Sequence, residues 1–199
     1  TAEIFRRFSG GLLHRRSQIG FFLNESAVGV YTIAAMAFEL ASQLIFVVRL
    51  NLNPLLTKYF NQQNFSSLLK LSRISTVGMG AVMAFGFLIA YLLFPIVVTL
   101  IFDDPVYLDA AVPLNWLFLS LIIASGILSF NMILTQCGKP EWHSLYMIVT
   151  LIINIIANAF LVPALGIAGA ALGTCIAVVA SGFLLILMAR LLLGVRLLF

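Results

Sequence analysis

Three polar side chains, Glu39, Gln43 and Arg49, interrupt an apolar segment of this chain, FELASQLIFVVRLNLNP, which runs from Phe38 to Pro54. An ionisable group at the centre of a bilayer is costly unless it faces protein or water. Glu39 and Gln43 are four residues apart, so a helix places both on one face. We therefore expect Glu39 to line a cavity or to pair with another part of the protein.

Arg49 follows Glu39 by ten residues, which is about 15 Å along a helix and well round its axis, so the two cannot pair directly. Two interpretations of Arg49 are open. It can snorkel to the nearby interface, or it can line a cavity and meet an anionic phosphate. Asn154 and Asn158 share one face of a later apolar segment, where hydrogen bonding between helices is favoured over contact with a substrate.

The remaining reactive side chains form no enzyme motif. His14 and His143 lack a second His, Cys or Asp at metal-ligand spacing, and Cys137 and Cys175 do not form a CxxC pair. The sequence contains no P-loop, no G-x-S-x-G and no H-E-x-x-H motif. We expect no enzymatic activity, no catalytic residue, no metal site and no cofactor.

The composition places these residues in a membrane. Of 199 residues, 62% are hydrophobic and only 9% are charged, far from the balance of soluble domains. We expect a polytopic membrane protein and interpret the net charge of +4 as a topology signal, not as affinity for nucleic acid. The sequence lacks an initiator Met and a convincing signal peptide, which favours a fragment of a longer protein.

Five apolar segments approach or exceed the roughly 20 residues that a spanning helix needs. They are Ala27–Leu56, Leu71–Phe102, Leu114–Gln136, Leu145–Val162 and Ile167–Leu193, and turn-forming residues such as Pro163 to Gly166 separate them. We predict an all-α bundle of five to six spanning helices. Residues 1–23 form either a truncated first helix or an interfacial segment, and residues 24–199 form the transmembrane bundle.

The basic residues predict how this bundle is oriented. Alternate crossings bring six of them to one side, which the positive-inside bias makes cytoplasmic, together with the C-terminus: Lys58, Lys70, Arg73, Lys139, Arg190 and Arg196. The opposite loops carry no Lys or Arg, and Asp103, Asp104 and Asp109 gather there. Arg15 and Arg16 lie too close to Glu25 for a full crossing between them, so their side stays open.

Two stretches carry a resemblance to a known family. AVGVYTIAAM, Ala27 to Met36, resembles the "vGxYxxA" stretch of bacterial polysaccharide flippases. LTQCGKPEWHSLYMIVTLIINIIANAFLVPALGIAGAALGTCIA, Leu134 to Ala177, is similar to their C-terminal signature, in which a Gly-Lys turn, an Asn-containing helix and an "iPxxGixGAAxaT" turn follow one another. These proteins are the O-antigen and capsule repeat-unit exporters of the MATE-like superfamily, and the resemblance covers nearly everything after Gln18.

The resemblance implies one half of a two-bundle transporter in the bacterial inner membrane, with the N-terminal six-helix bundle absent. It implies translocation of undecaprenyl-diphosphate-linked oligosaccharide repeat units by alternating access, among membrane lipids and beside polysaccharide polymerase machinery. The implied cavity is cationic: Arg49 is the candidate phosphate contact and Arg16 the second. Glu39 and Gln43 are candidate sugar contacts, or Glu39 is linked to a proton or cation, and Asn154 completes the set.

Two other functions compete with this one. The MATE multidrug branch of the superfamily usually presents acidic groups to cationic drugs, and Glu39 fits either branch, whereas Arg49 and the PALGIAGAALGT turn favour the saccharide branch. A non-transporting membrane subunit of a polysaccharide assembly complex is the third alternative, because an isolated half cannot alternate access against a partner bundle.

Overall fold

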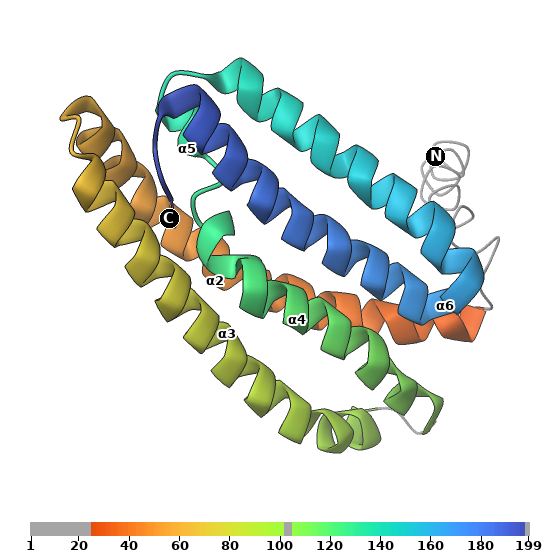
Figure 1. Ribbon diagram of the computed structural model, residues 1–199. Coiled ribbons are helices and arrows are strands. Elements are labelled where there is room, and N and C mark those ends of the chain that lie inside the picture. Colours follow the sequence, from red (N-terminus) through yellow and green to blue (C-terminus); the bar gives the residue numbers. More distant parts are fainter. Residues whose placement is uncertain (1–24, 102–104, 198–199) are drawn as a thin grey trace, which may run out of the picture.

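The computed structural model describes residues 25–101 and 105–197, and every regular element in these two ranges is helical. In chain order the elements are α2 (Glu25–Asn61), α3 (Phe65–Ile101), the 3-10 helix η1 (Pro105–Ala110), α4 (Ala111–Leu128), α5 (Ile133–Gln136) and α6 (Pro140–Leu193) (Figure 1). The predicted all-α class is therefore confirmed. Segment 1–23, with Arg15 and Arg16, lies outside the described residues, as do Asp103 and Asp104.

Four helices in the described ranges are long and apolar enough to cross a membrane: Gly29–Asn61, Phe65–Leu100, Tyr107–Gln136 and Pro140–Leu193. Their most apolar windows have mean hydropathies from 1.7 to 2.5. These helices indicate a membrane-embedded protein. The prediction of five to six spans counted the last of them as two separate segments.

The longest helix, α6, folds back on itself at Gly166. This residue has φ 58° and ψ −130°, a conformation that interrupts the helix. A Cβ atom on Gly169 would overlap the Leu161 carbonyl, and one on Gly173 would overlap the Asn158 side chain. Such pairs cannot meet in a straight helix, so α6 consists of two antiparallel arms, 140–165 and 167–193 (Figure 1).

Helix α4 occupies the centre of the bundle. About two thirds of the residues in its apolar window are buried (67%), against 11% in the windows of α2 and α3. It packs against α6, α3 and α2. Gly126 permits the crossing with α3, because a Cβ atom there would overlap the backbone of Thr76. Helices α3 and α6 carry most of the exposed large apolar side chains, as expected for surfaces in contact with lipid.

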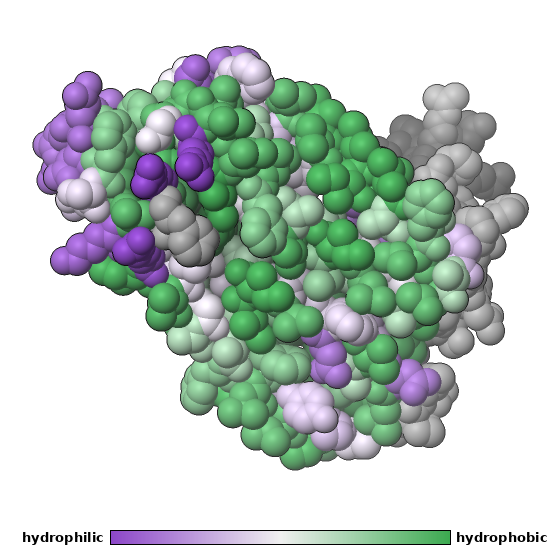
Figure 2. Space-filling model, viewed as in Figure 1, coloured by the Kyte–Doolittle hydropathy of each residue, from purple (hydrophilic) through white to green (hydrophobic). Residues whose placement is uncertain are grey.

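The predicted turns at one end of the bundle are present. Asn64 begins α3 by accepting a hydrogen bond at Oδ1 from the Ser67 backbone N–H (3.1 Å). Gly138 adopts a positive φ of 79°, and Pro140 then opens α6. The six basic residues predicted to share one side belong to elements that meet at this end, where Figure 2 shows hydrophilic residues gathered over an otherwise largely hydrophobic face.

Candidate functional site

A polar cluster forms where the central helix α4 ends inside the bundle. The chain leaves α4 after Leu128 and turns through residues 129–132 before α5 begins. Arg49 reaches this break from α2 and donates a hydrogen bond from Nη2 to the Leu128 carbonyl oxygen (3.4 Å). A cation is favourable there, because the last carbonyls of a helix carry partial negative charge.

Helix α6 contributes two aromatic side chains to the same cluster. The His143 and Tyr146 rings stack with centroids 5.7 Å apart and an interplanar angle of 30°. His143 hydrogen-bonds the backbone of Asn131 within the break, and both rings interact electrostatically with Arg49. Tyr146 is buried and lies within hydrogen-bonding reach of Ser181 on the second arm of α6. The cluster therefore joins α2, the α4–α5 break and both arms of α6.

Three polar atoms of this cluster are buried without a hydrogen-bond partner in the described part of the chain: Arg49 Nε, Asn131 Oδ1 and His143 Nδ1. Asn53 Oδ1, one turn along α2 from Arg49, is buried and unpaired as well. Buried polar atoms in folded proteins are nearly always paired, and each unpaired one typically costs about 1–3 kcal/mol. The cluster therefore has unused capacity for hydrogen bonds.

Glu39 and Gln43 lie on a different face of α2. Both side chains are exposed, and so are the neighbouring Met36 and Leu40. No described residue pairs with the Glu39 carboxylate; the nearby Ser42 hydroxyl donates to the Glu39 backbone carbonyl instead (2.7 Å). Glu39 and Gln43 thus share the polar face predicted from their spacing. They point out of the bundle, whereas Arg49 points into it.

Asn154 lies elsewhere, on the first arm of α6. Its side-chain oxygen accepts a hydrogen bond from Asn158 Nδ2 (3.1 Å), and Asn158 packs against Gly173 of the second arm. The pair therefore belongs to the seam between the two arms. Of the five predicted cavity residues, the structure brings together only Glu39 and Gln43, and Arg16 lies outside the described residues.

The residues that surround Arg49 could not be predicted from spacing. His143 lacks a partner at metal-ligand spacing, and no motif of the sequence singles out Asn53, Asn131 or Tyr146. Their shared signal is weak: each is a polar or amphipathic residue within about two turns of a helix end on the basic side. In the described residues, no three His, Cys, Asp or Glu side chains come together as a metal site would require.

Comparison of the chain with protein-family models, with curated proteins and with solved structures finds no match. The geometry of α2 and of the α4 break, together with the sequence resemblance, is thus the basis for assigning a function.

Proposed function

We propose that this chain forms the C-terminal bundle of an exporter that moves undecaprenyl-diphosphate-linked oligosaccharide units across the bacterial inner membrane by alternating access. The observation that carries the proposal is the exposure of Glu39 and Gln43 near the middle of α2. Glu39 lies twelve residues from Ala27, where the apolar segment of the sequence begins, which is about 18 Å and near the middle of an approximately 30 Å hydrocarbon core.

An exposed carboxylate at this depth is unfavourable against lipid and requires water or another protein. The exposed face of α2 is accordingly one wall of an aqueous cavity, closed on its other side by a second helix bundle. A carboxylate and an amide are suitable contacts there for sugar hydroxyls, because together they donate and accept several hydrogen bonds. Glu39 and Gln43 are two of the five residues that the sequence resemblance assigns to the cavity.

The crossing pattern that we propose has five spans and a cytoplasmic C-terminus. Each arm of α6 contains about 26 residues and is roughly 39 Å long, enough to cross an approximately 30 Å core separately. The basic elements gathered at one end of the bundle make that end cytoplasmic under the positive-inside bias.

A second function is supported by one specific observation. The Glu39 carboxylate has no basic partner in the described residues, so it could bind a cationic drug or carry a coupling cation, as in a multidrug antiporter. The two functions differ in the chemistry of the cargo, which allows them to be separated experimentally.

The test is complementation of bacteria that lack their own repeat-unit flippase with the gene that encodes this chain. Surface polysaccharide is measured for the wild type, Glu39→Gln and Gln43→Leu at equal expression in the membrane. Lys70→Gln, which removes an exposed charge at the basic end, is the matched control. We expect the first two variants to reduce surface polysaccharide and the control to retain it.

Wild-type polysaccharide in both α2 variants would contradict the cavity assignment. If the wild-type gene restores no polysaccharide but increases resistance to cationic dyes, and Glu39→Gln abolishes that resistance, the multidrug function replaces the saccharide function.

A further inference from the structure

The chain turns back onto the bundle where α6 ends. Gly194 adopts a left-handed conformation, with φ 66° and ψ 11°, that stops the helix. The Val195 N–H then donates to the Ala189 carbonyl oxygen (3.2 Å), which fixes the direction of the residues that follow. Figure 1 shows this end of the chain running back from α6 across the basic end of the bundle.

Residues 194–197, which we call the strap, place their side chains alternately inside and outside the bundle. Val195 and Leu197 are 0% and 1% exposed, whereas Arg196 between them is exposed. Such an alternation is typical of an extended segment with one apolar side. The strap is therefore anchored in the bundle by two apolar side chains, and its charged side chain stays at the surface.

The strap connects two helices that do not pack against each other. In the described ranges α3 packs against α2, α4 and η1, and α6 packs against α2, α4 and α5, but α3 and α6 are not in contact. The buried Ser72 hydroxyl of α3 donates a hydrogen bond to the Leu197 carbonyl oxygen. Val195 and Leu197 also share one core cluster with Leu68 of α3 and Leu185 of α6. The strap thus joins α3 to the second arm of α6.

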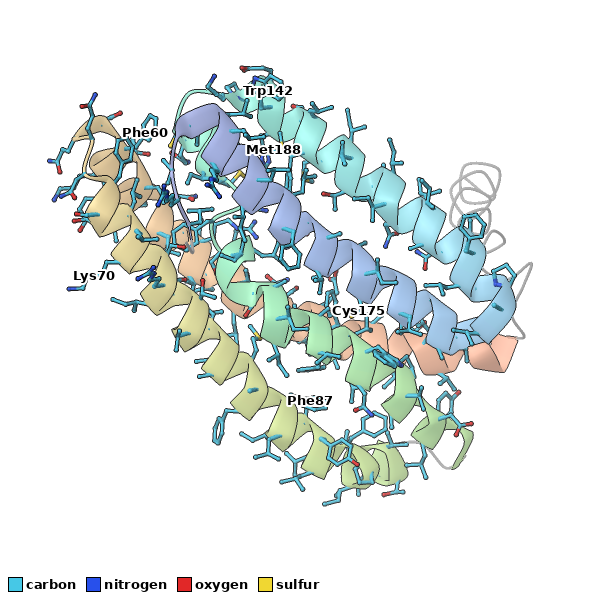
Figure 3. The ribbon with its side chains drawn as sticks, in the orientation of Figure 1. Phe60, Lys70, Phe87, Trp142, Cys175 and Met188 are labelled. Carbon is cyan, nitrogen blue, oxygen red and sulfur yellow. The ribbon has the colours of Figure 1, made fainter. Side chains whose placement is uncertain are left out.

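The α4–α5 break contributes to the same core cluster. Phe130, Ile133 and Leu134 belong to it and are fully buried. Figure 3 shows the end of the chain between α3, which carries Lys70, and the second arm of α6, which carries Met188. Because α3 and α6 are not in contact, the closure of the cluster on this side depends on the strap.

We infer that the strap is a conformational latch. When it is docked, it closes the basic end of the bundle between α3 and α6, and when it is released, these two helices can separate there. The docked contact consists of two apolar side chains and one side-chain hydrogen bond, so it can open while the helices stay folded. Release admits water from that side of the membrane to the α4–α5 break.

The other helix contacts limit the motion to one end. The two arms of α6 stay joined along the seam at Gly169 and Gly173, and α3 stays in contact with α4 at Gly126. The latch belongs to the bundle itself, whatever cargo the protein carries. Loss of polysaccharide in Glu39→Gln and opening of the strap are separate outcomes, and either can fail alone.

The experiment measures the distance between α3 and α6 at the basic end by double electron–electron resonance. Spin labels are attached to Lys70→Cys and Arg190→Cys, two exposed positions, in the purified chain without Cys137 and Cys175 in nanodiscs. Figure 3 shows that Lys70 points away from the bundle, so a label there leaves the strap undisturbed. A second pair, Ser144→Cys and Arg190→Cys, reports the distance between the two arms of α6.

The double substitution Val195→Ser and Leu197→Ser releases the strap, because it makes both inward side chains polar. Arg196→Gln changes only the outward side chain and is the matched control. We expect the double variant to shift the α3–α6 distance to longer values and to broaden it, and the control to leave it unchanged. Ser72→Ala removes the hydrogen-bond donor and is expected to cause a smaller shift in the same direction.

Cys137 gives a second readout in the chain that keeps its own cysteines, because its side chain packs against the same core cluster. We expect release of the strap to accelerate alkylation of Cys137 by N-ethylmaleimide at least about tenfold, as located by mass spectrometry. Wild-type distances and alkylation in the double variant would overturn the latch. A changed distance between the two arms of α6 would overturn it as well, because the strap would then support the whole fold and not one end.

Discussion

Single glycines set how closely the helices of this bundle approach one another. Helix α3 crosses α4 so closely at Gly126 that a methyl group there would overlap backbone atoms of Thr76, which cannot move aside as a flexible side chain can. A Cβ atom added to Gly86 on α3 would have no neighbouring atom within 4 Å. The same residue type is thus required for packing at one position and free of contacts at the other.

Gly126→Ala is expected to lower the free energy of unfolding by about 1–3 kcal/mol, because the added methyl group forces α3 and α4 apart. Gly86→Ala is the control and is expected to keep or slightly raise stability, since alanine favours a helix over glycine. Thermal unfolding of both variants in the same detergent measures the difference. Equal midpoints would show that the α3–α4 crossing is looser than the structure indicates.

Cys137 lies in the α5–α6 turn, between two apolar spans, and the reactivity of its thiol depends on how deeply this turn is buried. Burial raises the pKa of its thiol to about 11, so almost none of the reactive thiolate is present near neutral pH. At pH 8 we expect its alkylation by N-ethylmaleimide to be roughly a hundredfold slower than that of an ordinary cysteine, and to accelerate as the pH approaches 11.

The control for Cys137 places a cysteine at Ser144, an exposed position one turn into α6, in a chain without Cys137 and Cys175. Similar alkylation rates of Cys137 in the wild type and of the Ser144→Cys variant at pH 8 would contradict the burial of Cys137. A rate for Cys137 that does not change with pH would do so as well.

At the scale of whole elements, hydropathy located the helices but not their ends. The predicted segment Ala27–Leu56 is α2, Glu25–Asn61, because polar residues beyond the apolar span continue the same backbone hydrogen bonds. The turn near Gly166 could be predicted from Pro163 and the glycine. The break after Leu128 could not, since residues 129–132 contain neither Pro nor Gly.

The same limit applies to the candidate site. The spacing of Glu39 and Gln43 was sufficient to place both on one face of a helix, and the structure agrees. Arg49 donates to the Leu128 backbone carbonyl, which lies at the unpredicted break in α4 and also accepts a hydrogen bond from the Asn131 N–H (3.1 Å). Every residue has a backbone carbonyl, so residue types do not indicate which carbonyl a side chain will contact. Only the three-dimensional arrangement reveals this contact.

The two arms of α6 depend on the backbone conformation of Gly166. Its φ of 58° and ψ of −130° lie outside the regions open to residues with a Cβ atom, whereas Gly194, with φ 66° and ψ 11°, lies close to the left-handed helical region. Gly166→Ala is expected to cost about 1–3 kcal/mol in unfolding free energy, and Gly194→Ala less. Unfolding in denaturant compares the two variants, and a larger loss from Gly194→Ala would contradict the fold-back geometry at Gly166.

For the whole molecule, the distribution of the charged residues and the fold-back of α6 both favour the same membrane topology. The α2–α3 turn, the α5–α6 turn and the end of α6 meet at one end of the bundle, and the fold-back at Gly166 lies at the other (Figure 1). If both arms of α6 cross the membrane, Lys70 and Arg190 face one compartment while Asp109 and Leu165 face the opposite one.

Single cysteines at these four exposed positions, in a chain without Cys137 and Cys175, test this topology in intact cells. We expect a membrane-impermeant maleimide to label Asp109→Cys and Leu165→Cys from outside, and to label Lys70→Cys and Arg190→Cys only after the cells are opened. Labelling of Arg190→Cys but not Lys70→Cys from outside would mean that only one arm of α6 crosses the membrane. Failure to label Leu165→Cys from outside would mean that neither arm crosses fully. We expect two full crossings for two physical reasons. Each arm is roughly 39 Å long, which exceeds the approximately 30 Å hydrocarbon core. The sequence between Glu141 and Arg190 contains no Asp, Glu, Lys or Arg that would hold an arm at the interface.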